Sequence, residues 1–216
     1  MIEGNSKDNT LAILQGNSGR ITKIVSEPDK GIYDALNKGI QHATGDVIGI
    51  LHSDDMFFDA DVLKEVARAF EEDPDLEATL GDIVFVNKTD LDKTIRTYSS
   101  KKWRPGKFAW GFMPAHPSFF CKKDVYERLG GYKLNYRIAS DYELLIRYLL
   151  INKVQYKYLP LITTKMRLGG VSTSGFKSLV LLNKEIKRAC DENGIYTNYL
   201  MIYSKYFFKI FEFLRF

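Results

Sequence analysis

With 216 residues, a hydrophobic fraction of 45% and a charged fraction of 27%, the chain has the size and composition of one globular domain with a hydrophobic core. Its net charge of +4 is small and its basic residues are scattered until the C-terminus, which argues against nucleic acid as a partner. No run approaches the roughly 20 apolar residues of a membrane-spanning helix, and the opening residues lack the basic and apolar stretches of a signal peptide.

Strand and helix patterns alternate along the chain, which predicts an α/β fold with a central sheet flanked by helices. The run at 47–51 is apolar throughout, and such a run suits a strand buried on both faces of a mainly parallel sheet. The first half predicts strands at 21–25 and 47–51 and helices at 31–43 and 59–72. The second half predicts strands at 78–86, 117–121 and 154–159, helices at 123–129, 142–151, 178–192 and 199–214, and a polar, irregular stretch at 87–104.

A pair of adjacent carboxylates directly follows the apolar strand at 47–51, in the sequence Ser53-Asp54-Asp55. In open α/β sheets, ligands bind beyond the carboxyl ends of the strands. Two neighbouring carboxylates repel each other unless a cation or hydrogen-bond donors compensate, and Mg²⁺ or Mn²⁺ bridging to diphosphate oxygens is a natural partner. The alternative is that one of them caps the next helix.

A second polar group lies upstream, where Asp34, Asn37 and Lys38 share one face of the predicted helix at i, i+3 and i+4. A solvated helix face would look the same.

Taken together and in order, these segments resemble the signature of family 2 glycosyltransferases, which have the GT-A type nucleotide-diphospho-sugar transferase fold. The resemblance covers about Ile2 to Ser172 and is specific as a series, whereas no single motif would be. Gly169–Ser172 is similar to a loop common in the branch that makes surface polysaccharides. The matching segments are the turn at Glu3–Thr10, the run Asp29–Ile40, the D-x-D variant Ser53–Asp55, the strand His116–Phe120 and the segment Ser140–Leu144.

The resemblance implies a role for each acidic position. Asp55 would bind Mg²⁺ or Mn²⁺, with Ser53 in the first position of the D-x-D pattern, and Asp54 would face the sugar or ribose. Glu3 stands where the family recognises the nucleotide base. The residues that would line the nucleotide-sugar pocket are Asp29, Asp34, Asn37 and Lys38.

Asp141 is the expected general base, because inverting transfer needs a carboxylate that takes the proton of the acceptor hydroxyl opposite the leaving diphosphate. It could instead, or also, cap the helix that follows, and Glu143 is its local competitor. His116 is expected to touch a phosphate or the acceptor, or to be structural. Trp110 is a candidate for stacking on an acceptor sugar, although among Trp103, Trp110 and Phe112 we expect at least two to be core residues.

The C-terminal part, residues 173–216, is expected to form helices that lie beyond the transferase domain of residues 1–172. The last helix is rich in aromatic residues and carries Lys205, Lys209 and Glu212 on one face. This pattern suits a helix lying on an anionic membrane, and equally one packed on the domain or on a second subunit of a homodimer. Two distant cysteines, Cys121 and Cys190, favour free thiols in a cytoplasmic setting. Membrane contact through the last helix would make the protein peripheral on the cytoplasmic face of the membrane.

Relatives in the family start with a strand, a tight turn and a helix, and the chain opens after them, so we expect an incomplete N-terminus and weak or no transfer activity. Two functions stay open. One is an inverting, metal-dependent transferase that moves a sugar from a nucleotide-diphosphate donor, expected to be of the UDP type, to a glycan or lipid-linked acceptor in surface polysaccharide biosynthesis. The other is an inactive binding or scaffold protein that retains the fold.

Overall fold

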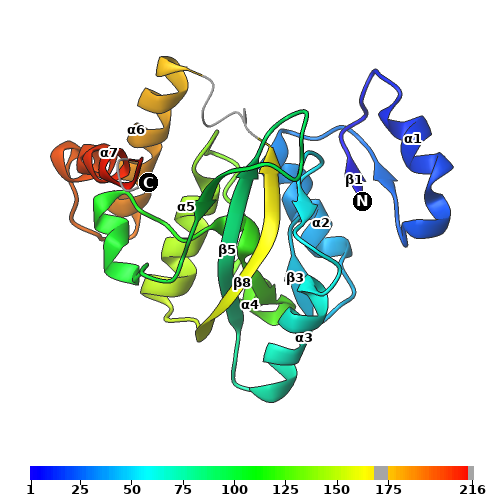
Figure 1. Ribbon diagram of the computed structural model, residues 1–216, viewed down its shortest axis with the longest axis horizontal. Helices are drawn as coiled ribbons and strands as arrows, with labels where there is room; N and C mark the ends of the chain where they lie inside the picture. The colour runs from blue at the N-terminus through cyan, green and yellow to red at the C-terminus, as the bar shows by residue number, and fades with distance from the viewer. Residues whose placement is uncertain (168–174, 214–216) are drawn as a thin grey trace.

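The computed structural model describes residues 1–167 and 175–213, and a six-stranded sheet lies at its centre (Figure 1). The strand order is β3-β7-β5-β8-β4, and β6 also pairs with β5. The segment Gly169–Ser172, expected to be a loop, lies outside the described residues. The strands are β3 Val47–Gly49, β4 Met56–Phe57, β5 Ala78–Val86, β6 Thr94–Tyr98, β7 Phe120–Lys122 and β8 Tyr156–Arg167.

The sheet is mixed, as expected, but its strands are not mainly parallel. Among the described strands of this six-stranded sheet, only β5 and β8 pair in parallel, while β3–β7, β4–β8, β5–β6 and β5–β7 are antiparallel. The expectation of mainly parallel strands is therefore wrong for this sheet. The apolar run at 47–51 contributes to β3, which is an edge strand of the described sheet and has only Ile48 buried. The pattern therefore indicates neither burial on both faces nor the direction of the neighbouring strands.

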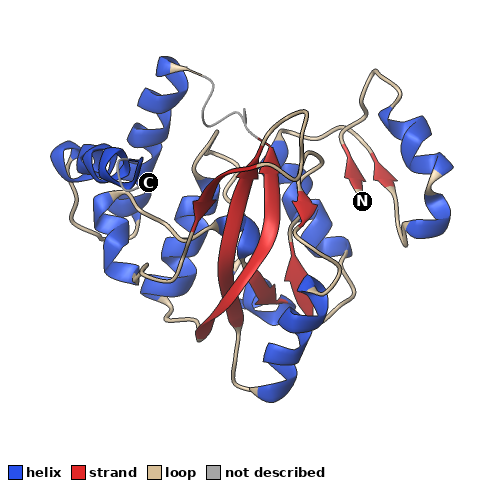
Figure 2. Cartoon of the chain, viewed as in Figure 1, coloured by secondary structure: helices blue, strands red, loops and turns tan. Residues whose placement is uncertain are grey.

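Each predicted helix is present, with small shifts at its ends, and Figure 2 shows the helices packed around the sheet. The helix predicted at 142–151 changes character halfway, because α5 ends at Leu145 and a π-helical segment, Ile146–Ile151, continues it. Strand β6 lies inside the stretch predicted to be irregular, where its mostly exposed residues give little periodic signal. The helices are α2 Ile32–His42, α3 Val62–Glu72, α4 Lys123–Leu129, α5 Ser140–Leu145, α6 Phe176–Glu192 and α7 Tyr199–Phe213.

The N-terminal residues form a separate small unit, which lies to the right of the main sheet in Figure 1. Strands β1 (Ile2–Glu3) and β2 (Val25–Ser26) pair in parallel in a two-stranded sheet, and α1 (Thr10–Gly16) lies between them in the chain. No residue of α1 is buried. The unit therefore has little core of its own.

The main core includes the C-terminal helices. Ile186, Ala189 and Cys190 of α6 and Ile202 of α7 are buried in the same cluster as Leu80 of the central strand. Helices α6 and α7 thus pack on the domain, on the left in Figure 1. A second cluster forms around α3. None of the helices in the described ranges is both long and apolar enough to cross a membrane.

Candidate functional site

The predicted metal-binding turn lies between β3 and β4, and it contains a buried acid. Asp55 is 8% exposed, and its Oδ2 atom is buried without a hydrogen-bond partner. Burial, followed by the charge of Asp54, raises the pKa of Asp55 to about 6. A carboxylate that is buried away from water and receives no hydrogen bond is stabilised by a nearby cation, so Asp55 fits a metal-binding role. The alternative that the pair caps the next helix is not seen, because the N-cap of α3 is Asp61.

The predicted base is joined to this turn through two histidines. Asp141 is the second residue of α5, and its Oδ2 lies 3.3 Å from Nδ1 of His116, while its Oδ1 accepts a hydrogen bond of 2.8 Å from the backbone of Tyr142. The ring of His116 lies 6.2 Å from that of His52, which immediately precedes Ser53. The turn after β3 and the start of α5 are therefore brought together.

His52 is a site residue that the sequence does not single out, although its position beside Ser53 is a signal. Burial, and then the neighbouring His116, lower the pKa of His52, while the charges of Asp54 and Asp141 oppose this. A neutral ring beside the two carboxylates can accept or donate a hydrogen bond.

The alternative roles proposed for the base segment are resolved by hydrogen bonds. The N-cap of α5 is Ala139, so Asp141 does not cap it. Glu143 is fully buried and pairs with Arg147 at 3.1 Å and Lys133 at 2.9 Å. Burial alone would raise the pKa of Glu143, but these two cations lower it. Glu143 therefore belongs to a structural ion pair. Asp141 is the acid of this segment that contacts His116.

A buried acid of α6 holds the turn that leads into Asp141. Glu185 accepts backbone hydrogen bonds from Arg137 at 2.8 Å, Ile138 at 2.8 Å and Ala139 at 2.9 Å. Three amide groups in succession are thus satisfied by one carboxylate that is 6% exposed. The sequence gives no signal for this contact, because the partners are more than 45 residues apart.

Glu3 and Asp29, predicted to bind the donor, already serve the local structure. The buried carboxylate of Glu3 accepts hydrogen bonds from Ser26 and from the backbone of Ser6, which lower its pKa to about 2. Asp29 accepts a bond of 2.8 Å from the backbone of Gly31.

The polar face predicted on α2 is also engaged. Asp34 accepts a bond of 3.0 Å from the backbone of Lys30, and Lys38 pairs with Glu27 at 2.9 Å and with Asp34 at 3.5 Å.

Asn37 uses both ends of its amide on one distant residue. Its Nδ2 donates to the carbonyl of Tyr132 and its Oδ1 accepts from the amide of Tyr132, each at 2.8 Å. A Cβ atom added to the neighbouring Gly131 would lie 2.2 Å from Oδ1 of Asn37. The structure therefore gives Asn37 the role of a clamp between α2 and the segment before α5, and its predicted donor contact stays untested.

The aromatic candidates divide as expected, with more core than surface. Trp103 is buried against Phe108 at 5.0 Å, and Phe112 packs against the main core. Trp110 is 46% exposed at the end of the 3₁₀ helix Pro105–Trp110, so its side chain is available to a ligand.

Within residues 1–167 and 175–213, no three His, Cys, Asp or Glu side chains are arranged as a metal cluster. Asp55, with its neighbours Ser53 and Asp54, offers oxygen atoms of the kind that a divalent ion takes as ligands. Such an ion would need further oxygen ligands from a bound diphosphate or from water, a coordination that Mg²⁺ commonly has.

Comparison with known proteins places the chain in a family. The model of glycosyl transferase family 2 matches residues 1–130. An uncharacterized glycosyltransferase of Mycobacterium tuberculosis is 34% identical over 153 residues, which cover 70% of this chain and 56% of the relative. A PGL/p-HBAD biosynthesis glycosyltransferase of Mycobacterium bovis is 27% identical over 157 residues, which cover 68% and 56%. The chain thus spans about half the length of the curated relatives that it matches.

Solved structures share the fold. Staphylococcus aureus TarS 1–349 in complex with UDP-GlcNAc has a TM-score of 0.60 at 14% identity, with 87% of this chain and 56% of that chain covered. The mannosyltransferase PcManGT from Pyrobaculum calidifontis, in complex with GDP-Man and Mn²⁺, has a TM-score of 0.56 at 18% identity, with 87% and 54% covered. The mixed sheet with its flanking helices is therefore of the GT-A type. Fold, family model and relatives agree, and the chain belongs to glycosyl transferase family 2.

Proposed function

We propose that this protein transfers a sugar from a nucleoside diphosphate donor to an acceptor hydroxyl with inversion at the anomeric carbon. The observation that carries the proposal is the proximity of two acidic segments, since the turn with Asp55 reaches Asp141 through His52 and His116. One segment would bind the donor diphosphate and the other would deprotonate the acceptor. The structural neighbours in complex with UDP-GlcNAc and with GDP-Man and Mn²⁺ support a nucleotide-sugar donor.

Asp55 would hold Mg²⁺ or Mn²⁺, with Ser53 beside it and Asp54 toward the donor. When bound, the cation supplies charge compensation for the departing diphosphate. Its protein ligand is suited to this role, because Oδ2 of Asp55 is buried without a partner. Asp141 would accept the proton of the acceptor hydroxyl, and His116, at 3.3 Å, fixes the orientation of that carboxylate.

The acceptor class, a glycan or lipid-linked glycan of the cell surface, rests on the relatives and is part of the proposal. Contact with a membrane or with a second copy of the chain stays a prediction. Exposed Tyr199, Leu200, Tyr203 and Phe207 on α7 would suit either partner, whereas Lys205 is buried and contributes no charge to that face. Residues 209 and 212, the other charged positions of the predicted face, have no described side chains.

The test is release of nucleoside diphosphate from UDP-, GDP- and dTDP-sugars, with and without Mn²⁺. We expect one donor class to be turned over in a metal-dependent way and Asp141→Asn to lower kcat by about 10²–10⁴-fold, the usual contribution of a general base. Asp75→Asn, an exposed acid outside the cluster, is the matched control. NMR of the product tests inversion at the anomeric carbon.

Equal turnover in Asp141→Asn and the wild type would refute the assignment of the base. Metal-dependent binding of a nucleotide sugar without turnover would favour the second function, a binding protein that keeps the fold. Thermal stabilisation by each nucleotide sugar measures that binding directly.

A further inference from the structure

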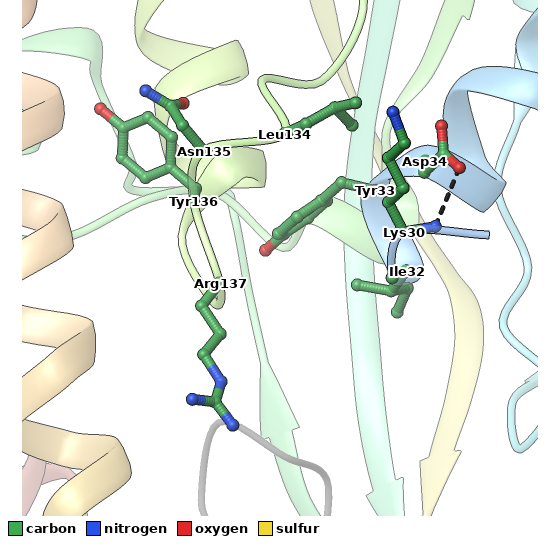
Figure 3. A pocket seen from close by; sticks show the side chains of 9 residues that line it. Lys30, Ile32, Tyr33, Asp34, Leu134, Asn135, Tyr136 and Arg137 are labelled. Atoms are coloured by element: carbon green, nitrogen blue, oxygen red, sulfur yellow. Dashed lines mark hydrogen bonds between the residues drawn. The ribbon is translucent and has the colours of Figure 1, made fainter.

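Asp141 is held from two sides, by the loop before it and by His116. The loop of residues 134–137 faces the start of α2 across a cavity of about 380 Å³ (Figure 3). Its last amide, that of Arg137, is bonded to Glu185. On the other side, Nδ1 of His116 lies 3.3 Å from the carboxylate of Asp141, and the imidazole is one third exposed. Any group that fixes His116 therefore also helps to position the proposed base.

Hydrogen bonds tie the backbone on both sides of His116 to β5, directly or through Ser100. Before the histidine, the amide of Ala115 donates a bond of 3.0 Å to the hydroxyl of Ser100. After it, the buried Ser118 accepts a bond of 3.0 Å from the amide of Gly81, and its hydroxyl lies 2.9 Å from the carbonyl of Gly81. The imidazole thus extends from a backbone that is anchored at both ends.

Asp82 of β5 anchors the link that runs through Ser100. Its Oδ1 accepts a bond of 2.9 Å from the amide of Ser100, and its Oδ2 accepts one of 3.0 Å from the hydroxyl of Tyr158. Both donors are uncharged groups. Ser100 is 3% exposed and Ala115 is 2% exposed, so little water reaches the bond between them. A series of hydrogen bonds therefore connects Asp82, through Ser100, to the residue before His116.

An irregularity of the sheet determines where Asp82 stands. The register of β5 on β8 shifts on both sides of Asp82, which pairs with Ile162. The neighbouring Gly81 leaves no room for a side chain, since a Cβ atom there would lie 2.7 Å from the carbonyl oxygen of Leu161. Such irregularities change the direction of a side chain and are common beside active sites. The position of Asp82 is thus set by the two central strands.

We propose that Asp82 is a positioning residue of the transfer reaction, which acts through Ser100 to hold His116 against the base. The proposal rests on the proposed function, which makes Asp141 that base. A carboxylate that only stabilised the fold would act through both of its hydrogen bonds. A positioning residue acts on catalysis through the bond to Ser100 alone.

The test measures turnover of a nucleotide sugar with Mn²⁺ in four variants. Asp82→Ala and Ser100→Ala should each lower kcat by about 10–100-fold with little change in the KM for the donor, because the base is misplaced while the turn of residues 53–55 is not. Asp82→Asn should recover most of kcat, since its amide oxygen can accept from Ser100 and its NH₂ group can donate to Tyr158. Tyr158→Phe, the matched control, removes the other bond of the same carboxylate and should keep the kcat of the wild type.

A second readout does not depend on activity. The NMR signal of the His116 ring should shift in Asp82→Ala and in Ser100→Ala but not in Tyr158→Phe, because only the first two break the link to the backbone before the ring. The double variant of Asp82 and Ser100 should be no slower than either single variant, since both changes break the same link. Ser100→Ala removes one hydroxyl group and tests the link even where Asp82→Ala does not fold.

The proposal is overturned if Tyr158→Phe lowers kcat as much as Asp82→Ala does, or if the ring signal of His116 is unchanged in Ser100→Ala. It is also overturned if Asp82→Asn is as slow as Asp82→Ala, because the hydrogen bonds that an amide can replace would then not be the cause. A shifted ring signal, with no turnover of any nucleotide sugar by the wild type, would support the link from Asp82 to His116 while refuting the proposed function.

Discussion

The three hydrogen bonds from residues 137–139 to Glu185 predict that Glu185→Gln lowers the stability of the protein and loosens the turn before Asp141. In Glu185→Gln one oxygen can still accept from the amides of Ile138 and Ala139, but an NH₂ group then faces the amide of Arg137. One charge-assisted hydrogen bond is lost and two donors oppose each other. Such a loss costs about 2 kcal/mol. For a protein of this length the melting temperature should fall by roughly 4–8 °C.

The matched control is Asn183→Ala, which also removes a buried polar group of α6. Asn183 donates to the carbonyl of Leu179 and to Tyr206, each at 3.0 Å, on the side of α6 that meets α7. Both variants should lower stability, but only Glu185→Gln should speed hydrogen exchange at residues 137–139. It should also lower kcat more than it changes the KM for the donor, since Asp141 follows that turn.

Two results would refute this reasoning. One is equal exchange at 137–139 in the two variants once their stabilities are taken into account. The other is wild-type kcat in Glu185→Gln. Glu185→Asp, whose shorter side chain keeps the charge, should recover part of kcat only if the carboxylate positions the turn.

Three further predictions concern the other buried acids. The raised pKa of Asp55 adds stability that is fully present below its ordinary value of 3.8 and lost as pH rises through about 6, on the order of 3 kcal/mol. In metal-free buffer the denaturation midpoint of the wild type should therefore fall as pH rises through about 6, and Asp55→Asn should remove this fall. The same variant should lose the stabilisation by Mn²⁺ with a nucleotide sugar. A pH profile that is the same in the variant and the wild type would contradict the assigned pKa. Glu143→Gln should lower the unfolding free energy measured by urea titration by about 3 kcal/mol, because Arg147 and Lys133 would lose their buried partner. A loss near zero would show that these ion pairs do not stabilise the fold. The lowered pKa of Glu3 implies stability that is present above its ordinary value of 4.5 and lost as pH falls through about 2. The melting temperature of Glu3→Gln should therefore depend less on pH in acid than that of the wild type. An equal dependence of melting temperature on pH in the two proteins would argue against the bonds to Ser6 and Ser26.

The helices and the long central strand could be predicted from sequence, because their apolar residues recur with the period of the element. The stripe of Val62, Val66 and Ala69 in α3 is buried as its spacing predicts. The direction of the strands could not be predicted in the same way, since a strand buried on both faces carries the same pattern in either direction.

The candidate site could be predicted only where its residues lie in short motifs. The turn Ser53–Asp55 and the position of Asp141 follow from motif order, and the structure brings them close together through His52 and His116. The role of Glu185 depends on contacts between segments that are distant in the chain. A helical pattern gives the face on which a residue lies but not the backbone that this face will meet.

The clamp at Asn37 couples two positions that are far apart in the chain. A Cβ atom at position 131 would meet the amide oxygen of Asn37, so Gly131→Ala requires the Asn37 side chain to move or residue 37 to be smaller. A smaller residue at 37, however, leaves the peptide groups of Tyr132 unpaired. The residues at positions 37 and 131 are therefore expected to change together, and redesign of the segment that leads to Asp141 has to alter both.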